Sequence, residues 1–164
     1  EYGHLLHDDP EWREGAEWFA ARTIDISKLL FEHGRLPETY GKASGAGGGK
    51  VRITYQDSCH LRNGMKSSDA PRRLMARIAD AEFVELFEAE RCCGSAGIYN
   101  LTQPERASDI LDHKMEHVKK TEAHYLLTSN PGCLLQMKLG IEREGMSGKM
   151  EAVHIVDFLA ERMG

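Results

Sequence analysis

Several features that define common classes of protein are missing from this sequence. No stretch of apolar residues approaches the roughly 18–20 residues that a bilayer-spanning helix requires, and no signal peptide is visible. The net charge of −5 has the wrong sign for the basic footprint of a nucleic-acid-binding domain. We therefore expect a cytoplasmic protein with no nucleic-acid partner. Any association with the inner membrane is expected to come through a complex.

Cysteine is scarce as well, but its placement is informative. The 164 residues contain only four cysteines, and two of these are adjacent: Cys59, Cys92, Cys93 and Cys133. Vicinal cysteines suit a structural disulfide framework poorly, and converging cysteines in a reducing compartment more often form a metal site. A single cysteine can equally be a small buried apolar side chain. The set of four therefore favours a site more strongly than any one member does.

Short alternating runs of β-branched and other apolar residues predict four strands. They cover residues 51–55, 83–87, 124–128 and 152–156. Helical patterns fill the intervals and begin near Pro71, near Pro104, directly after Cys133 and at Asp157. The alternation predicts an α/β fold. We expect a three-layer domain with a small parallel sheet of about four strands flanked by helices, preceded by an N-terminal helical segment.

The cysteines follow the predicted strands. Cys59, the Cys92–Cys93 pair and Cys133 each come shortly after the end of a different strand. Binding sites in open parallel sheets lie beyond the carboxyl ends of the strands. We therefore expect the four thiols to gather in one pocket at that edge of the sheet.

Three blocks of sequence around these cysteines resemble a known family. They are residues 55–62 (YQDSCHLR), 91–97 (RCCGSAG) and 130–133 (NPGC). Together they are similar to the cysteine-rich CCG domain of the glycolate oxidase iron–sulfur subunit, of lactate-utilisation proteins and of heterodisulfide reductase. The likeness is greatest to the C-terminal CCG domain of the glycolate oxidase iron–sulfur subunit, and it covers roughly residues 51–160.

The resemblance implies a cofactor and a role. It makes Cys59, Cys92, Cys93 and Cys133 the ligands of an iron–sulfur cluster, and it assigns no catalytic residue to this chain. The domain would pass electrons from flavin-containing subunits of a glycolate oxidase-like 2-hydroxy-acid oxidoreductase. Gln136 stands where heterodisulfide reductase has a further cysteine. Four thiolates disfavour its five-cysteine non-cubane cluster and suit an ordinary [4Fe–4S] cluster.

Two alternatives remain open from the sequence. Four thiolates can also hold a tetrahedral zinc ion, which would make the domain a structural or interaction module of the same kind of complex. The vicinal pair Cys92–Cys93 could instead take part in thiol–disulfide exchange, which requires a depressed thiol pKa.

Residues beside the cysteines have both functional and ordinary interpretations. His60 is a candidate fifth ligand or a local hydrogen-bonding group. Asp57 and Arg91 either tune thiolate charge or are solvated. Gly94 and Gly97 permit a tight turn whose N–H groups can point at sulfur. A further run of acidic residues is interpreted as a solvated edge: Glu85, Glu88 and Glu90.

The first part of the chain is predicted to be a separate segment. Residues 1–49 are expected to form an N-terminal helical segment and a Gly-rich linker, and residues 50–164 the CCG domain. One helix or two are expected between Pro10 and Phe31, with an N-cap at Asp8–Asp9. The chain has no initial Met and no closely spaced ferredoxin-type cysteines, so we expect a longer protein with an N-terminal half. The surface of residues 1–49 that contacts this N-terminal half should expose apolar residues: Trp12, Trp18 and Phe19.

Overall fold

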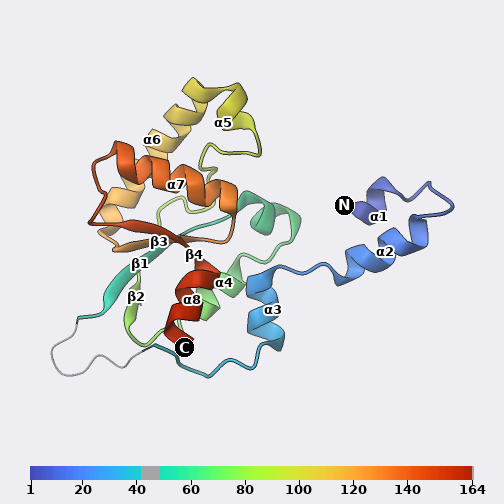
Figure 1. Ribbon diagram of the computed structural model, residues 1–164, viewed down its shortest axis with the longest axis horizontal. Helices are drawn as coiled ribbons and strands as arrows, with labels where there is room; N and C mark the ends of the chain where they lie inside the picture. Colours follow the sequence, from blue (N-terminus) through green and yellow to red (C-terminus); the bar gives the residue numbers. More distant parts are fainter. Residues whose placement is uncertain (42–48, 164) are drawn as a thin grey trace.

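The chain folds around a four-stranded parallel sheet, seen in a computed structural model that describes residues 1–41 and 49–163 (Figure 1). The strands lie in the order β2-β1-β3-β4. Their bounds are Val51–Gln56 for β1, Ala81–Phe83 for β2, Tyr125–Thr128 for β3 and Glu151–His154 for β4. The predicted α/β fold with a small parallel sheet is confirmed. The predicted Gly-rich linker lies mostly at residues 42–48, outside the described residues.

Helices cover both faces of the sheet and make three layers (Figure 1). One face carries α6 (Pro104–Thr121) and α7 (Pro131–Arg143), and the other carries α4 (Asp69–Met75) and α8 (Ile155–Met163), with α3 (Ile26–His33) beside them. The remaining helices are short or lie outside the layers: α1 (Tyr2–Leu5), α2 (Arg13–Arg22), α5 (Tyr99–Thr102) and the π-helix η1 (His60–Gly64).

The central strand β3 supplies both cores because successive side chains of a strand point to opposite faces. Leu126 packs with Leu111 and Met137 under α6 and α7. Leu127 packs with Leu74 and Phe158 under α4 and α8. Both leucines are fully buried, and each burial contributes about 1.5–3 kcal/mol to folding. The continuous apolar character of β3 is thus typical of a parallel strand covered on both sides.

Two strand boundaries differ from the prediction. Strand β2 covers Ala81–Phe83 instead of 83–87, because the chain turns at Glu88, which has a left-handed φ of 54°. The Ala89 N–H donates to the Leu86 carbonyl within this turn. Strand β4 ends at His154, where the predicted strand continued to 156. There the His154 side chain accepts the Val156 N–H at 3.3 Å and closes the first turn of α8.

Two helix boundaries differ as well. Helix α4 ends at Met75 although apolar residues at helical spacing continue to Ala81, and Ala81 opens β2. Helix α7 begins at Pro131 instead of after Cys133. Its N-cap is Asn130, whose side chain accepts the Cys133 N–H at 3.1 Å. Cys133 therefore lies inside the first turn of a helix.

The N-terminal segment forms two helices after α1, and the break between them has a local cause. Asp25 ends the connection after α2 and caps α3 by accepting the Ser27 N–H at 2.8 Å. The predicted N-cap at Asp8–Asp9 is wrong, because the N-cap of α2 is Trp12 and makes no side-chain cap hydrogen bond. Asp9 instead accepts the N–H groups of Glu11 and Trp12 in the turn before the helix. The prediction of one helix or two is thereby resolved as two.

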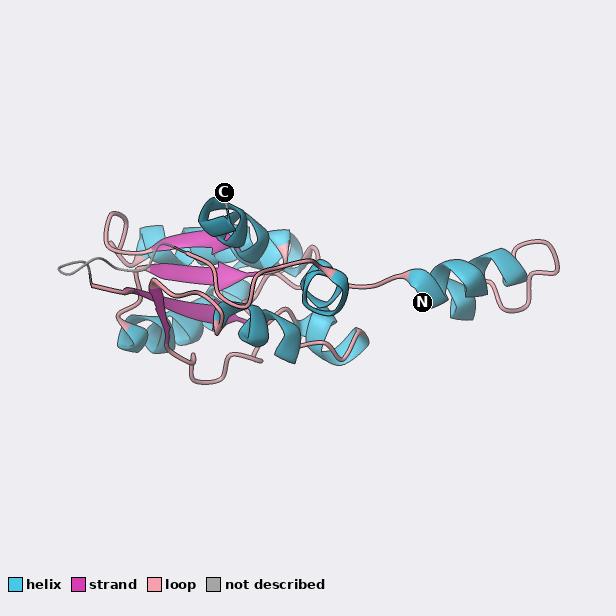
Figure 2. Cartoon of the chain, turned by 90° about the horizontal axis from the view of Figure 1, so that it is seen from below, coloured by secondary structure: helices cyan, strands magenta, loops and turns pink. Residues whose placement is uncertain are grey.

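Helices α1 and α2 pack on each other and extend away from the sheet (Figure 2). The rings of Tyr2 and Phe19 meet edge to face with centroids 5.2 Å apart. Trp12, Trp18 and Phe19 are 60%, 58% and 51% exposed, so the predicted exposure of these residues is confirmed. In contrast, Phe31 of α3 packs against the core beside the sheet. No helix among the described residues is both long and apolar enough to cross a membrane.

Candidate functional site

The four cysteines line one cavity of about 360 Å³ beyond the carboxyl ends of β1 and β3. Besides the cysteines, its wall is made by three short segments: 57–60, 95–97 and 130–132. The expected convergence of Cys59, Cys92, Cys93 and Cys133 at the carboxyl edge is therefore observed. Their role as ligands stays a prediction. The described residues contain no disulfide, because all four cysteines are free.

Each thiol reaches the cavity by a different route. Cys59 follows β1 directly and is exposed at the start of η1. Cys133 is buried in the first turn of α7. The Cys92–Cys93 pair does not follow β2 directly, because residues 84–91 form an irregular loop first. Cys93 is buried in the core under α6 and α7, and Cys92 is half-buried.

The turn after Cys93 depends on glycine. Gly94 has a φ of 95°, and a Cβ there would lie 2.6 Å from the Ala107 carbonyl oxygen. Gly97 has a φ of 70°, so the predicted tight turn at both glycines is confirmed. The Gly94 N–H donates to Cys92 Sγ at 3.4 Å. The predicted use of this turn to direct N–H groups at sulfur is thus seen for one thiol.

Three of the four thiols, Cys92, Cys93 and Cys133, form a hydrogen-bonded chain that shifts their pKa values. The hydrogen bond to Cys93, together with burial, raises the pKa of Cys92 well above its ordinary value. The hydrogen bond to Cys133 is the main cause that raises the pKa of Cys93 to about 11, and the same bond lowers the pKa of Cys133. The raised pKa values of Cys92 and Cys93 disfavour the thiolate form that disulfide exchange requires.

The spacing of the sulfurs can be compared with the needs of a zinc ion and of a cluster. Among the described residues, no three cysteine sulfurs lie within 4.8 Å of one another. A tetrahedral zinc ion with Zn–S bonds of about 2.3 Å needs sulfurs about 3.8 Å apart. In a cubane cluster each thiolate binds a different iron, so the sulfurs stand further apart. Two pairs of thiols, Cys92–Cys93 and Cys93–Cys133, lie within hydrogen-bonding distance of each other, so side-chain rotations are needed to seat either a zinc ion or a cluster.

Asp57 is a structural anchor of the cavity. Its carboxylate is 1% exposed and accepts hydrogen bonds from Arg62 at 3.0 Å and Arg72 at 2.8 Å. Arg72 also pairs with Glu85 at 2.7 Å, so neither acid is a free solvated group. The two arginines neutralise Asp57, and the arrangement fixes the chain between β1 and Cys59.

Two other predicted residues also lie at or near the cavity. His60 lines it, and its ring packs over Gly64, so its role as a ligand stays a prediction. Gln136, which stands in place of a further thiol, is 4% exposed. Its side-chain oxygen accepts a hydrogen bond from Asn100 at 3.2 Å and joins α5 to α7. The substitution thus leaves a supporting contact where the fifth cysteine would stand.

A buried lysine behind the cavity was missed by sequence reasoning. Lys114 of α6 is 1% exposed, and its Nζ donates to the Glu88 carbonyl. Burial lowers its pKa, while Cys93 and nearby acidic groups oppose that shift. Its spacing from Leu111 and Val118, both buried on the same helical face, is the sequence signal that could have revealed it.

The largest cavity has a different location. It measures about 650 Å³ and is open to solvent near Tyr125 and Glu151, at the amino ends of β3 and β4. It contains no cysteine. All four cysteines line the smaller cavity instead, on the opposite edge of the sheet.

Comparison with known proteins relates the same segment to a family and to longer proteins. The family model for the cysteine-rich domain CCG matches residues 53–138. The chain is 52% identical over 164 residues to the probable glycolate oxidase iron-sulfur subunit of Bacillus subtilis (strain 168) and spans 36% of that protein. It is 32% identical over 162 residues to lactate utilization protein A of Geobacillus kaustophilus (strain HTA426), of which it spans 64%. The chain thus spans between about one third and two thirds of the length of these relatives.

Proposed function

The chain belongs to the CCG family of cysteine-rich domains, and from this membership we propose that it is an iron–sulfur electron-transfer domain. Its whole protein would be a subunit of a 2-hydroxy-acid oxidoreductase complex of the glycolate oxidase or lactate-utilisation kind. The names of its relatives support this assignment. The observation that carries it is the cavity into which all four cysteines converge.

The four thiols supply a complete ligand set for a [4Fe–4S] cluster: Cys59, Cys92, Cys93 and Cys133. When bound, such a cluster accepts and releases one electron. The chain contributes burial at Cys93 and Cys133 and the Gly94 N–H directed at Cys92 Sγ. Burial and N–H···S hydrogen bonds are the factors that set a cluster potential.

The exposed rim of the cavity supports a partner at this edge. Cys59 is exposed there. Shortly after the lining residues Gly97 and Cys133, the side chains of Ile98, Leu101 and Leu135 are 67%, 78% and 69% exposed, and the Asn100–Gln136 hydrogen bond links the two segments. A partner that packs on this rim would exclude water from the cluster and shorten the path for electrons. We propose that this partner is a flavin-containing subunit or a further part of a longer protein of the kind that the chain matches.

The proposed setting keeps the predicted domain division. Residues 1–49 would form the connecting helical segment and linker, and residues 50–164 the cluster-binding domain. The exposed Trp12 and Trp18 on the connecting segment would contact the rest of the longer protein. We place the complex in the cytoplasm, at the inner membrane only through its other subunits.

Anaerobic reconstitution with iron and sulfide tests the proposal. We expect about four irons and four sulfides per chain, a brown protein and an electron paramagnetic resonance signal after reduction. Cys93→Ser should lose the cluster, because serine is a poor ligand for soft metals. Ser27→Ala is the matched control, since Ser27 is equally buried but lies in α3. A colourless protein with one zinc ion, or iron bound equally by Cys93→Ser, would contradict the proposal.

A further inference from the structure

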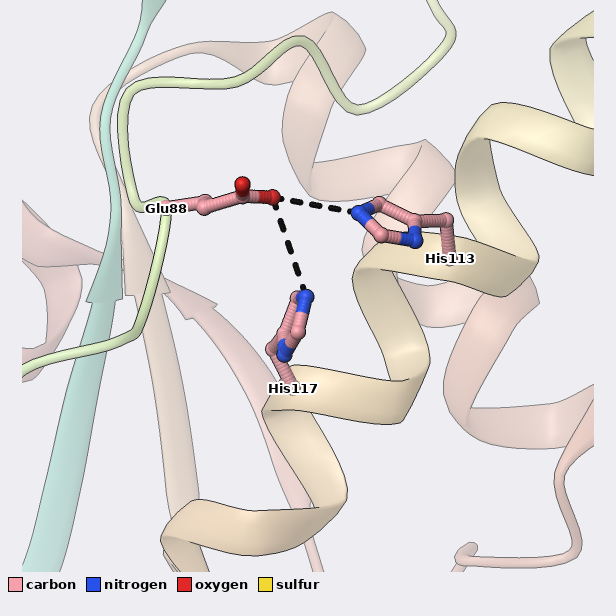
Figure 3. Close-up of side chains that lie close together, drawn as sticks. All are labelled: Glu88, His113 and His117. Atoms are coloured by element: carbon pink, nitrogen blue, oxygen red, sulfur yellow. Dashed lines mark hydrogen bonds and ion pairs between the residues drawn. The ribbon is translucent and has the colours of Figure 1, made fainter.

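A second group of metal-ligating side chains lies outside the cysteine cavity. Glu88, His113 and His117, here called the His–Glu cluster, direct their side chains toward one point (Figure 3). Glu88 Oε2 lies 3.1 Å from His113 Nε2 and 3.7 Å from His117 Nε2. All three atoms lie within 4.8 Å of one another. The histidines are four residues apart on α6, so they stand one turn apart on one face of the helix.

The spacing matches the coordination shell of a zinc-like ion. Bonds of about 2.0–2.2 Å to nitrogen and oxygen in a tetrahedral shell place neighbouring ligand atoms about 3.3–3.6 Å apart. The two carboxylate–imidazole distances of 3.1 and 3.7 Å lie on either side of that range. Small side-chain rotations of Glu88 and His113 are enough to reach it, because both side chains are partly exposed.

One imidazole nitrogen of the cluster lacks a partner. Among the described residues, His117 Nε2 is buried and makes no hydrogen bond, and the side chain as a whole is only 12% exposed. The Phe87 ring packs edge-on against the His117 ring, with centroids 4.9 Å apart, and restricts its rotation. A buried polar atom without a partner is costly. A cation at the centre of the cluster would satisfy this nitrogen.

The loop position that carries the Glu88 carboxylate is held in place by hydrogen bonds to the Glu88 backbone. Glu88 has a left-handed φ of 54°, and its carbonyl accepts both the Arg91 N–H at 3.0 Å and the Lys114 ammonium. Lys114 lies on α6 between the two histidines. The same lysine therefore ties the loop that carries the carboxylate to the helix that carries the imidazoles.

The cluster already attracts a positive charge. The Arg91 guanidinium lies 3.0 Å from His113 Nε2 and 3.2 Å from Glu88 Oε2. Its side chain is 58% exposed, so it can leave at little energetic cost. Arg91 thus marks the position that favours a cation and competes with one.

We propose that the His–Glu cluster binds one divalent transition-metal ion of the zinc, cobalt or nickel class. Two imidazoles and one carboxylate are borderline ligands that suit these ions and not magnesium or calcium. Three protein ligands leave a further coordination position for water. No thiol is among the three ligand atoms of the site, although Cys92 borders the same surface pocket as His113.

Titration calorimetry with Zn²⁺ on the full chain tests the proposal in a background without thiols, in which all four cysteines are replaced by serine. We expect one equivalent to bind, and His117→Ala to weaken binding at least tenfold. The double variant His4→Ala, His7→Ala is the matched control, because it removes an exposed histidine pair next to Asp8 that lies outside the cluster. Circular dichroism checks the fold. The same titration of the wild-type chain, followed by nuclear magnetic resonance of the histidine ring nitrogens, covers the case in which the serine background does not fold.

The behaviour of Arg91 sharpens the test. Removal of a competing surface charge by Arg91→Ala should tighten Zn²⁺ binding about two- to fivefold. A merely structural network of Arg91, Glu88 and His113 would not gain metal affinity in this way. Equal affinity in His117→Ala and its parent, or unchanged ring signals of His113 and His117 on addition of Zn²⁺, would overturn the proposal.

Discussion

The cysteine cavity and the His–Glu cluster are built from the same loop but differ in every property that selects a metal. The cavity presents four soft thiols, two of them buried, and among the described residues no three of them come within 4.8 Å of one another. The cluster presents two imidazoles and a carboxylate within 4.8 Å. Ligand softness and spacing together, and not the mere presence of ligands, therefore decide what each region can hold.

The loop that joins the two regions is only a few residues long. Glu88 and Arg91 face the cluster, whereas Cys92 and Cys93 face the cavity or the core. Lys114 lies behind this loop, bonded to the Glu88 carbonyl and close enough to Cys93 to act on it electrostatically. Variants in and around the loop can therefore disturb one region and spare the other.

The largest effect is expected from Gly94→Ala, which should distort the cysteine cavity and leave the His–Glu cluster intact. The new Cβ would meet the Ala107 carbonyl at 2.6 Å in a left-handed backbone conformation, at a cost of about 3 kcal/mol in the free energy of unfolding. Gly97→Ala should cost only about 1–2 kcal/mol, because its φ is also positive but nothing lies within 4 Å. Urea denaturation measures both.

Zn²⁺ binding at the His–Glu cluster should survive both glycine variants while iron binding in the cavity weakens in Gly94→Ala. Equal stability of the two variants would show that the close approach of Ala107 does not constrain the turn. A parallel loss of zinc and iron would show that the two regions are not separate.

The sequence predicts the elements whose signals are local. The runs at 51–55 and 124–128 give β1 and β3 almost to the residue, because short runs of β-branched and other apolar residues are a local signal for strands. The convergence of Cys59 and Cys133 follows from the rule that parallel strands end at a common edge. Fold and cavity could thus be predicted from pattern and topology.

The parts that escape prediction depend on contacts distant in sequence. The end of β2 is set by the turn at Glu88, which Lys114 stabilises from 26 residues away. His113 and His117 form an ordinary polar pair on an amphipathic helix until the fold places Glu88 opposite them. The spacing of four residues between His113 and His117 was the only local signal. The sequence alone does not show that Glu88 lies opposite them.

A smaller effect is expected from Lys114→Met, the change that touches both regions. Removal of a buried positive charge near Cys93 should lower the midpoint potential of the reconstituted centre by on the order of 50 mV, because the reduced, more negative state loses stabilisation. Zn²⁺ affinity at the cluster should fall as well, since Glu88 loses one of its anchors.

Lys120→Met is the control for that change, because Lys120 is exposed on the same helix. Protein-film voltammetry gives the potential and calorimetry gives the zinc affinity. A shift of the potential in Lys120→Met as large as in Lys114→Met would attribute the effect to net charge and not to the buried position.

The smallest effect concerns the titration of Glu88, which belongs to the cluster alone. Its hydrogen bond with His113, followed by the charge of Arg91, holds the pKa of the carboxyl below its ordinary value. A carboxyl with a depressed pKa in the folded state contributes stability above its unfolded pKa and loses that contribution as the pH falls through the folded value. His113→Ala should therefore raise the pKa of Glu88 toward the ordinary value, whereas Cys92→Ser should leave it unchanged. Carbon-13 nuclear magnetic resonance of the Glu88 carboxyl across the acidic pH range measures this pKa directly. An equal shift of the Glu88 pKa in both variants would mean that the charge in the cysteine cavity also influences the cluster.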